Sequence, residues 1–116
     1  MALAAALPAQ AVATYNVTGT TNTSGTLVTY SSNYRTHSVT GNITIKVTNG
    51  VTNGAKYGMI SQSGKRLAMS DPMTTGSKTW TSVLAGKYAI QAQQGACSLT
   101  QKLLGCDNSW SGSVTL

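Results

Sequence analysis

The sequence has very few groups that can carry acid–base or metal chemistry. It contains no glutamate, two aspartates (Asp71 and Asp107) and one histidine (His37) in 116 residues. Glycosidases need a pair of carboxylates, and a Ser-His-Asp triad would have to combine His37 with one of these aspartates. Asp71 precedes a proline and Asp107 follows a cysteine, where an aspartate stabilises a turn. We therefore expect no enzyme, no metal and no cofactor.

Long apolar runs and nucleotide-binding motifs are also missing. No stretch approaches the roughly 20 apolar residues that span a bilayer, and no glycine-rich phosphate loop or Gly-x-Ser-x-Gly elbow is present. The formal charge is +6, but the lysines and arginines are spread along the chain, and only Lys65-Arg66 is a pair. Nucleic-acid binders gather these residues on one face. We expect no transmembrane segment and no specific nucleic acid. The charge serves solubility, or it attracts an anionic cell-surface polymer.

The chain begins with a segment typical of the end of an export signal. Residues 1–13 are small and apolar, and both Ala9-Gln10-Ala11 and Ala11-Val12-Ala13 fit the cleavage rule. A positively charged start is missing. We expect residues 1–13 to be a signal-peptide remnant and the protein to be secreted into the extracellular medium. The alternative is an apolar N-terminal arm that docks on a partner or on the protein's own sheet, with Leu7, Val12 and Tyr15 as contact candidates.

Alternating apolar residues predict the fold of residues 14–116. Val39, Ile43, Ile45 and Val47 share one face of a segment whose other face is polar, which is typical of a half-buried strand. The same alternation recurs, with turn residues between, at Tyr15 with Val17, Leu27 to Tyr30, Tyr57 with Met59, Trp80 with Ser82 and Leu84, Tyr88 to Ala92, and Trp110 to Leu116. We expect one all-β domain, a small antiparallel β-sandwich of seven to eight short strands.

A short tandem duplicate lies in the middle of the chain. Residues 47–50 and 51–54 both read Val-Thr-Asn-Gly. Asn-Gly favours a tight hairpin turn, so we expect one copy to close a hairpin and the other to form a bulge or a widened loop.

Two cysteines lie near the C-terminus. In an exported chain, Cys97 and Cys106 predict one disulfide, because an even count reads as a bridge and a pair has one connectivity. Leu99, Leu103 and Leu104 between them are spaced as one helical turn or a bend. We expect these leucines to pin the loop to the core. The alternative is that the disulfide presents the loop, as some protease inhibitors do.

One segment has the composition of a recognition loop. Residues 30–37 combine tyrosines with Ser, Asn and Arg, which give wide amphipathic contact and forked donors. The partner-binding candidates are Tyr30, Asn33, Tyr34, Arg35 and His37. The alternative interpretation places Tyr30 at a strand end and Tyr34 at the core margin, with Arg35 and His37 in solvent.

The two tryptophans allow a second kind of site. Trp80 and Trp110 could form an aromatic platform for sugar rings, but both lie in alternating strands beside apolar neighbours. We therefore expect both to pack in the core.

In length, export signal and strand texture the chain resembles small exported β-sandwich proteins of Gram-positive bacteria, some of which are toxin-assembly subunits, bacteriocins or inhibitors. The likeness extends to layout alone. We expect a secreted binding protein, an adaptor subunit of a larger secreted assembly, toxin or antibacterial, with an extracellular protein partner. The alternatives are a carbohydrate or cell-wall binding module and a protease inhibitor presenting the Cys97–Cys106 loop.

Overall fold

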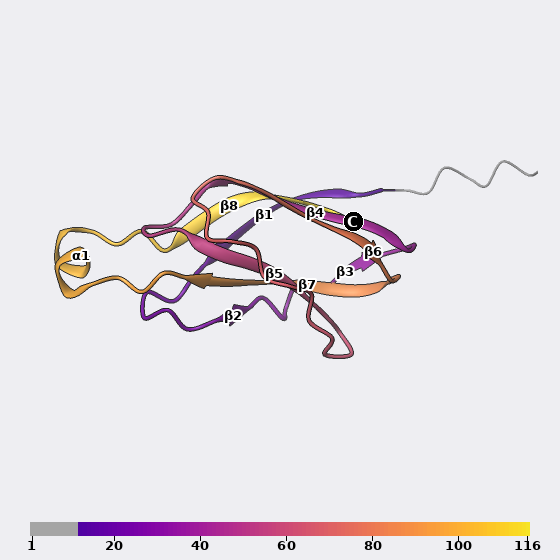
Figure 1. Cartoon of the computed structure of the whole chain (residues 1–116), viewed down its shortest axis with the longest axis horizontal. Helices are drawn as coiled ribbons and strands as arrows, with labels where there is room; N and C mark the ends of the chain where they lie inside the picture. Colours follow the sequence, from indigo (N-terminus) through magenta and orange to yellow (C-terminus); the bar gives the residue numbers. More distant parts are fainter. Residues whose placement is uncertain (1–11) are drawn as a thin grey trace, which may run out of the picture.

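A computed structural model describes residues 12–116, which form two antiparallel sheets packed face to face (Figure 1). The expected β-sandwich with one disulfide, Cys97–Cys106, is confirmed. The elements are β1 (Thr14–Thr20), β2 (Val28–Thr29), β3 (Arg35–His37), β4 (Gly41–Asn49), β5 (Ala55–Ser61), β6 (Gly76–Val83), β7 (Gly86–Gln94), α1 (Leu99–Leu104) and β8 (Ser109–Thr115).

The two sheets are built differently. The first has the strand order β1-β8-β4-β6, with β1 and β6 at its edges. In the second, β7 is central: β5 pairs along one side of it, while β2 and β3 pair one after the other along the other side. The edge strand β1 of the first sheet and the short strands β2 and β3 of the second therefore border one open side of the sandwich.

The strands of the first sheet follow the alternation of the sequence. Ile43, Ile45 and Val47 of β4 are buried, as are Trp110 and Val114 of β8, while the alternate residues of each strand point to the other face. These strands have one covered face, so a period of two is preserved. The expected alternation fails towards the end of β6, where Ser82 takes a positive φ of 53°.

Because of this irregularity, the side chains of the two residues after Ser82 lie on the faces opposite to those expected. We expected Leu84 to share the inward face of Trp80, but Val83 is buried instead and Leu84 is 61% exposed. A left-handed residue inside a strand turns the next side chain to the opposite face.

The central strand β7 is buried on both faces. Tyr88, Ile90 and Ala92 face the other sheet as expected, but Ala89 and Gln91 on the reverse side are buried too. Gln91 lies opposite Gly58 of β5, and Met69 packs where a side chain at Gly58 would lie.

The Asn-Gly duplicate does not close a hairpin. β4 and β5 belong to different sheets, so Asn53 and Gly54, both with positive φ, carry the chain from one sheet to the other. The first copy is closer to expectation, because the register of β4 against β8 shifts between Val47 and Asn49.

Two further findings bear on function. No helix in the described part of the chain is long and apolar enough to cross a membrane. Among residues 12–116, no group of three or more His, Cys, Asp or Glu side chains is placed to hold a metal ion.

Gly112 lies where the backbones of neighbouring strands in the first sheet approach closely. It pairs with Val17 on one side and Val47 on the other, and a Cβ there would collide with the Lys46 carbonyl. We predict that Gly112→Ala lowers the free energy of unfolding by about 1–3 kcal/mol, as overpacking does. Gly41→Ala is the matched control, because a Cβ at Gly41 meets nothing within 4 Å. Equal urea midpoints for the two variants would contradict this account of the sheet.

Candidate functional site

Four of the predicted contact residues meet at the open side of the sandwich. A pocket of about 140 Å³ lies there between β1 and the turn that joins β2 to β3. Its lining residues are Asn16, Val17, Thr18, Tyr30, Asn33, Arg35, Ile90 and Trp110. Tyr15, one strand position before Asn16, contacts Arg35 beside it. We call this region the open-edge site, defined by Tyr15, Tyr30, Asn33 and Arg35 with the pocket they border.

Tyr30 forms the wall of the open-edge site and is fixed by two hydrogen bonds. Its hydroxyl donates to the Thr20 carbonyl oxygen at 3.0 Å and accepts the indole N–H of Trp110 at 2.9 Å. The rings of Tyr30 and Trp110 meet edge to face at 5.8 Å. Gly19 makes this possible, because a Cβ there would lie 2.6 Å from the Trp110 nitrogen and 2.7 Å from Tyr30. Tyr30 therefore holds a defined position rather than that of a loose loop residue.

Arg35 brings the positive charge of the open-edge site. It begins β3, opposite Tyr88 of β7, and its guanidinium carbon lies 4.3 Å from the centroid of the Tyr15 ring. A cation over a tyrosine face is attracted by the ring quadrupole. The stack joins β1 to β3 across the open side, and the planar guanidinium offers a fork of donors suited to a carboxylate.

Asn33 and Tyr34 complete the predicted segment. The Asn33 N–H donates to the Tyr30 carbonyl oxygen at 3.1 Å, which closes the turn, and the Asn33 side chain is exposed at the pocket rim. Tyr34 is half-buried, which fits its alternative placement at the core margin.

His37 is not a contact residue, and the two expectations for it, contact and solvation, are both wrong. It is 2% exposed, its Nε2 donates to the Val83 carbonyl oxygen at 3.1 Å, and its ring meets Tyr88 edge to face at 6.0 Å. Residues 35–37 form the short strand β3, paired with the start of β7, which turns this side chain inward. The sequence pattern did not show this strand.

The tryptophans do not form a sugar platform. Trp80 is 7% exposed and donates its indole N–H to the Ala68 carbonyl at 2.7 Å, while Trp110 is 2% exposed. Both belong to the core, as their alternating neighbours predicted. The platform alternative is wrong because neither ring presents a face to solvent.

Of the three N-terminal contact candidates, Leu7 lies outside the described residues, whereas Val12 and Tyr15 lie within them. Val12 is 66% exposed, and Ala13 exchanges two backbone hydrogen bonds with Leu116 beside it. Tyr15 is the only one of the three that the structure places in the open-edge site.

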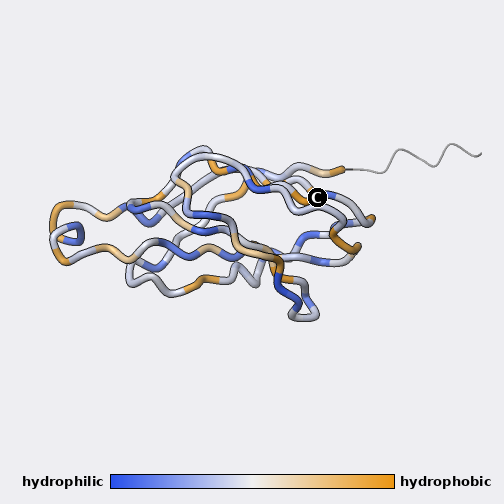
Figure 2. The backbone as a smooth tube through the Cα atoms, in the orientation of Figure 1, coloured by the Kyte–Doolittle hydropathy of each residue, from blue (hydrophilic) through white to orange (hydrophobic). Residues whose placement is uncertain are grey.

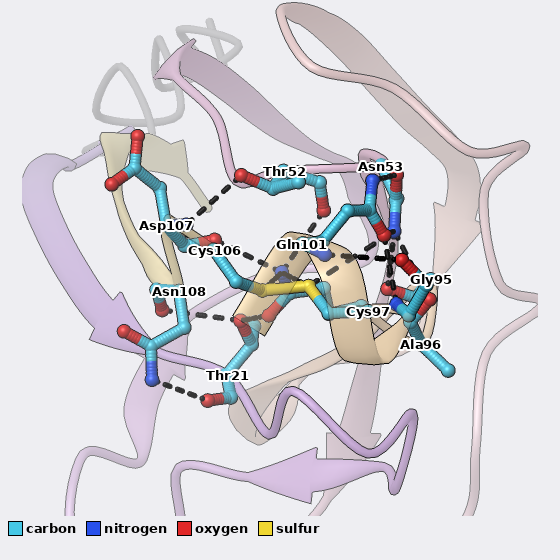
Figure 3. The surroundings of a disulfide bond; sticks show 12 residues. Thr21, Thr52, Asn53, Gly95, Ala96, Cys97, Gln101, Cys106, Asp107 and Asn108 are labelled. Carbon is cyan, nitrogen blue, oxygen red and sulfur yellow. Dashed lines mark hydrogen bonds between the residues drawn. A yellow bond between two sulfur atoms is a disulfide. The ribbon is translucent and has the colours of Figure 1, made fainter. Parts of the chain in front are cut away.

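The loop between Cys97 and Cys106 is exposed to solvent, and the expectation that its leucines pin it to the core is wrong. The expected helical turn forms as α1, yet Leu99, Leu103 and Leu104 are 76%, 79% and 85% exposed. Polar side chains hold the loop instead, around the disulfide (Figure 3).

Three amide side chains form this polar support, and none of them is among the predicted site residues. Gln94, 1% exposed, accepts a hydrogen bond from Thr21 and donates to the carbonyl oxygens of Thr52 and Asp107. Asn53 and Gln101 exchange reciprocal amide hydrogen bonds of 2.9 and 2.7 Å (Figure 3). The Asn-Gly duplicate was a usable signal for Asn53, whereas nothing local marked Gln94.

Burial changes the ionisation of Tyr30 in the open-edge site and of Tyr57 behind it. It raises the pKa of Tyr57 to about 12, with a smaller contribution from Tyr30, and it also raises the pKa of Tyr30 against the opposing hydrogen bond from Trp110. Tyr57 packs edge to face on Trp110 at 5.0 Å, and no residue within 12–116 accepts or donates at its hydroxyl.

Comparison with known proteins does not assign this chain to a group. No protein-family model matches it, and no curated protein matches it.

The two tyrosines make a matched pair of variants. We predict that Tyr30→Phe lowers the free energy of unfolding by about 1–3 kcal/mol, because the buried Trp110 N–H loses its acceptor. Tyr57→Phe should be neutral or stabilising, since it removes a buried hydroxyl without a partner in the described chain. Urea unfolding measures both, and equal losses would contradict the hydrogen-bond assignment.

Alkaline pH tests the burial of the same residues. An unfolded tyrosine ionises near pH 10, while Tyr57 in the folded chain ionises near 12. Between these values the unfolded chain has lost a proton that the folded chain keeps, so stability is full below pH 10 and falls as pH rises through 12. Unfolding free energies across this range should fall less in Tyr57→Phe. If phenolate absorbance showed all five tyrosines ionising together near pH 10 in the folded protein, the prediction would fail.

Proposed function

We propose that this is a secreted, non-catalytic binding protein that docks an extracellular protein partner at the open-edge site. The supporting observation is the convergence, on one side of the sandwich, of Tyr15, Tyr30, Asn33 and Arg35 around a pocket. Tyrosine and arginine dominate the energetics of many interfaces, because they bury wide amphipathic area and hold several donors.

The size and charge of the pocket indicate what it takes. At about 140 Å³ it is smaller than the roughly 300–1,000 Å³ of small-molecule and cofactor sites, and suits one inserted side chain. Arg35 is the only charged residue among its lining residues. A loop of the partner that carries a carboxylate into the pocket would pair with the guanidinium fork.

The placement of the rare ionisable groups supports binding over catalysis. His37 is buried behind β3 with Nε2 engaged by a backbone carbonyl. Asp71 and Asp107 are exposed, and the bonds that their backbone groups make with Ser70 and Thr52 do not involve the carboxylates. General acid–base chemistry needs such groups within reach of a substrate in a shared cleft.

The adaptor role is tested with the two arginines of the chain. The protein is isolated from the medium of its native source, its partner is identified and purified, and the affinity is measured. We predict that Arg35→Ala weakens binding by at least about tenfold and reduces its salt dependence. Arg66→Ala is the matched control and should bind as the unchanged protein does, because Arg66 is exposed and pairs with Ile60 after the turn that follows β5.

Two outcomes would count against the proposal. The first is a solitary monomer in the native medium. The second is a partner whose affinity is equal in the two arginine variants. If both variants weakened binding equally, and only to an anionic polymer, a general electrostatic attraction would replace the open-edge site.

A further inference from the structure

The helix α1 is the most exposed apolar feature in the described part of the chain. It lies beyond the ends of both sheets, at one extremity of the molecule (Figure 1). None of its six residues is buried, and Leu99, Leu103 and Leu104 are more than three-quarters exposed. Figure 2 shows hydrophobic stretches at this extremity on either side of a hydrophilic one. We call this feature the α1 tip, defined by residues 98–105.

The exposure of the leucines does not come from a loose loop. The disulfide joins the segment that leaves β7 to the segment that enters β8, directly beneath the helix. On one side Gln101 is bonded to Asn53, whose amide also donates to the Ala96 carbonyl oxygen at 3.0 Å. The side chain facing the protein is therefore a glutamine, and the leucines are held outward.

The helix also pairs part of its own backbone. Ser98 and Gln101 form a capping box, with Ser98 Oγ accepting from the Gln101 N–H and Gln101 Oε1 accepting from the Ser98 N–H. At the other end the Gly105 N–H donates to the Gln101 carbonyl oxygen. These bonds reduce the number of unpaired backbone groups, and with it the desolvation cost, when the tip approaches an apolar medium.

The size and shape of the tip favour a lipid surface over a protein groove or a second copy. Three leucines make a patch of a few hundred Å² at most, whereas a stable protein interface takes about 800 Å² from each partner. A tip-to-tip dimer would also bring Lys102 towards its copy with no acidic residue between Cys97 and Cys106 to offset it. A bilayer needs neither a large area nor a complementary shape.

The charge of the protein suits an anionic bilayer. The chain carries a net +6, Lys102 lies within the helix, and the carboxylate of Asp107 points away from the helix (Figure 3). Apolar insertion by one small group gives weak, reversible binding, and positive charge near an anionic surface strengthens it. We propose that the α1 tip inserts its leucines reversibly into the surface of an anionic lipid bilayer.

Vesicle binding tests this directly. The disulfide-bonded protein is mixed with vesicles of phosphatidylcholine, alone or with about one third phosphatidylglycerol, and bound protein is separated by flotation. We predict binding on the order of 10⁴ M⁻¹ or weaker to phosphatidylcholine and tighter binding to the anionic vesicles. Leu103→Ser combined with Leu104→Ser should lower both association constants by at least about tenfold.

The matched control is Leu84→Ser. Leu84 is 61% exposed in the turn between β6 and β7, at the opposite end of the sandwich from α1 (Figure 1), so its loss should leave vesicle binding unchanged. If the tip inserts, a brominated lipid should quench the fluorescence of a tryptophan placed by Leu103→Trp. Trp80 and Trp110 are buried in the core, so their fluorescence should not be quenched. Unchanged urea midpoints show that the serine variants are folded.

Three results would overturn the inference. They are no binding to either vesicle, equal binding by the Leu103/Leu104 and Leu84 variants, or concentration-dependent dimers that the tip variants abolish. Arg35→Ala should retain binding to phosphatidylcholine, so this test and that of the open-edge site fail independently.

Discussion

The indole N–H of Trp110 is the constraint on which the open side of the sandwich depends. Trp110 is 2% exposed, so its donor needs an acceptor inside the protein. Tyr30 supplies the acceptor across the gap between the sheets, and it can do so only because Gly19 has no side chain. The turn that carries Tyr30 also carries Asn33 and leads into Arg35. A requirement of the core therefore positions the residues that face a partner.

Beneath the α1 tip, amide side chains take the place of apolar packing. Gln94 joins three segments distant in sequence, those of Thr21, Thr52 and Asp107, beneath the disulfide. Its burial is tolerated because its donor and acceptor are both satisfied, whereas a half-paired amide would be costly. The leucines of the Cys97–Cys106 loop are then not needed for its stability, and they remain in solvent.

The predictable parts of the fold are the strands in which an alternating sequence pattern corresponds to one buried and one exposed face. β4 and β8 have a single covered face, so Ile43, Ile45 and Trp110 fall inward in step with the sequence. His37 was unpredictable because its burial depends on pairing with Gly86 and on the carbonyl of Val83, 46 residues along the chain. The spacing of the loop leucines correctly indicated a helical turn, but periodicity cannot say whether a neighbour covers the apolar face.

The same limit explains why the composition of the sequence indicates the residues of the candidate site but does not indicate the strand topology around them. Tyr30, Asn33 and Arg35 are contact candidates because their side chains offer amphipathic area and hydrogen-bonding groups, and these properties do not depend on where the fold places them. With two carboxylates against eight lysines and arginines, most positive charges have no carboxylate of the chain to pair with. The field they leave extends about a Debye length, near 10 Å, beyond the surface at 0.1 M salt. Because both the open-edge site and the α1 tip combine a cation with aromatic or apolar side chains, an anionic binding surface would gain electrostatic and apolar energy together at either site.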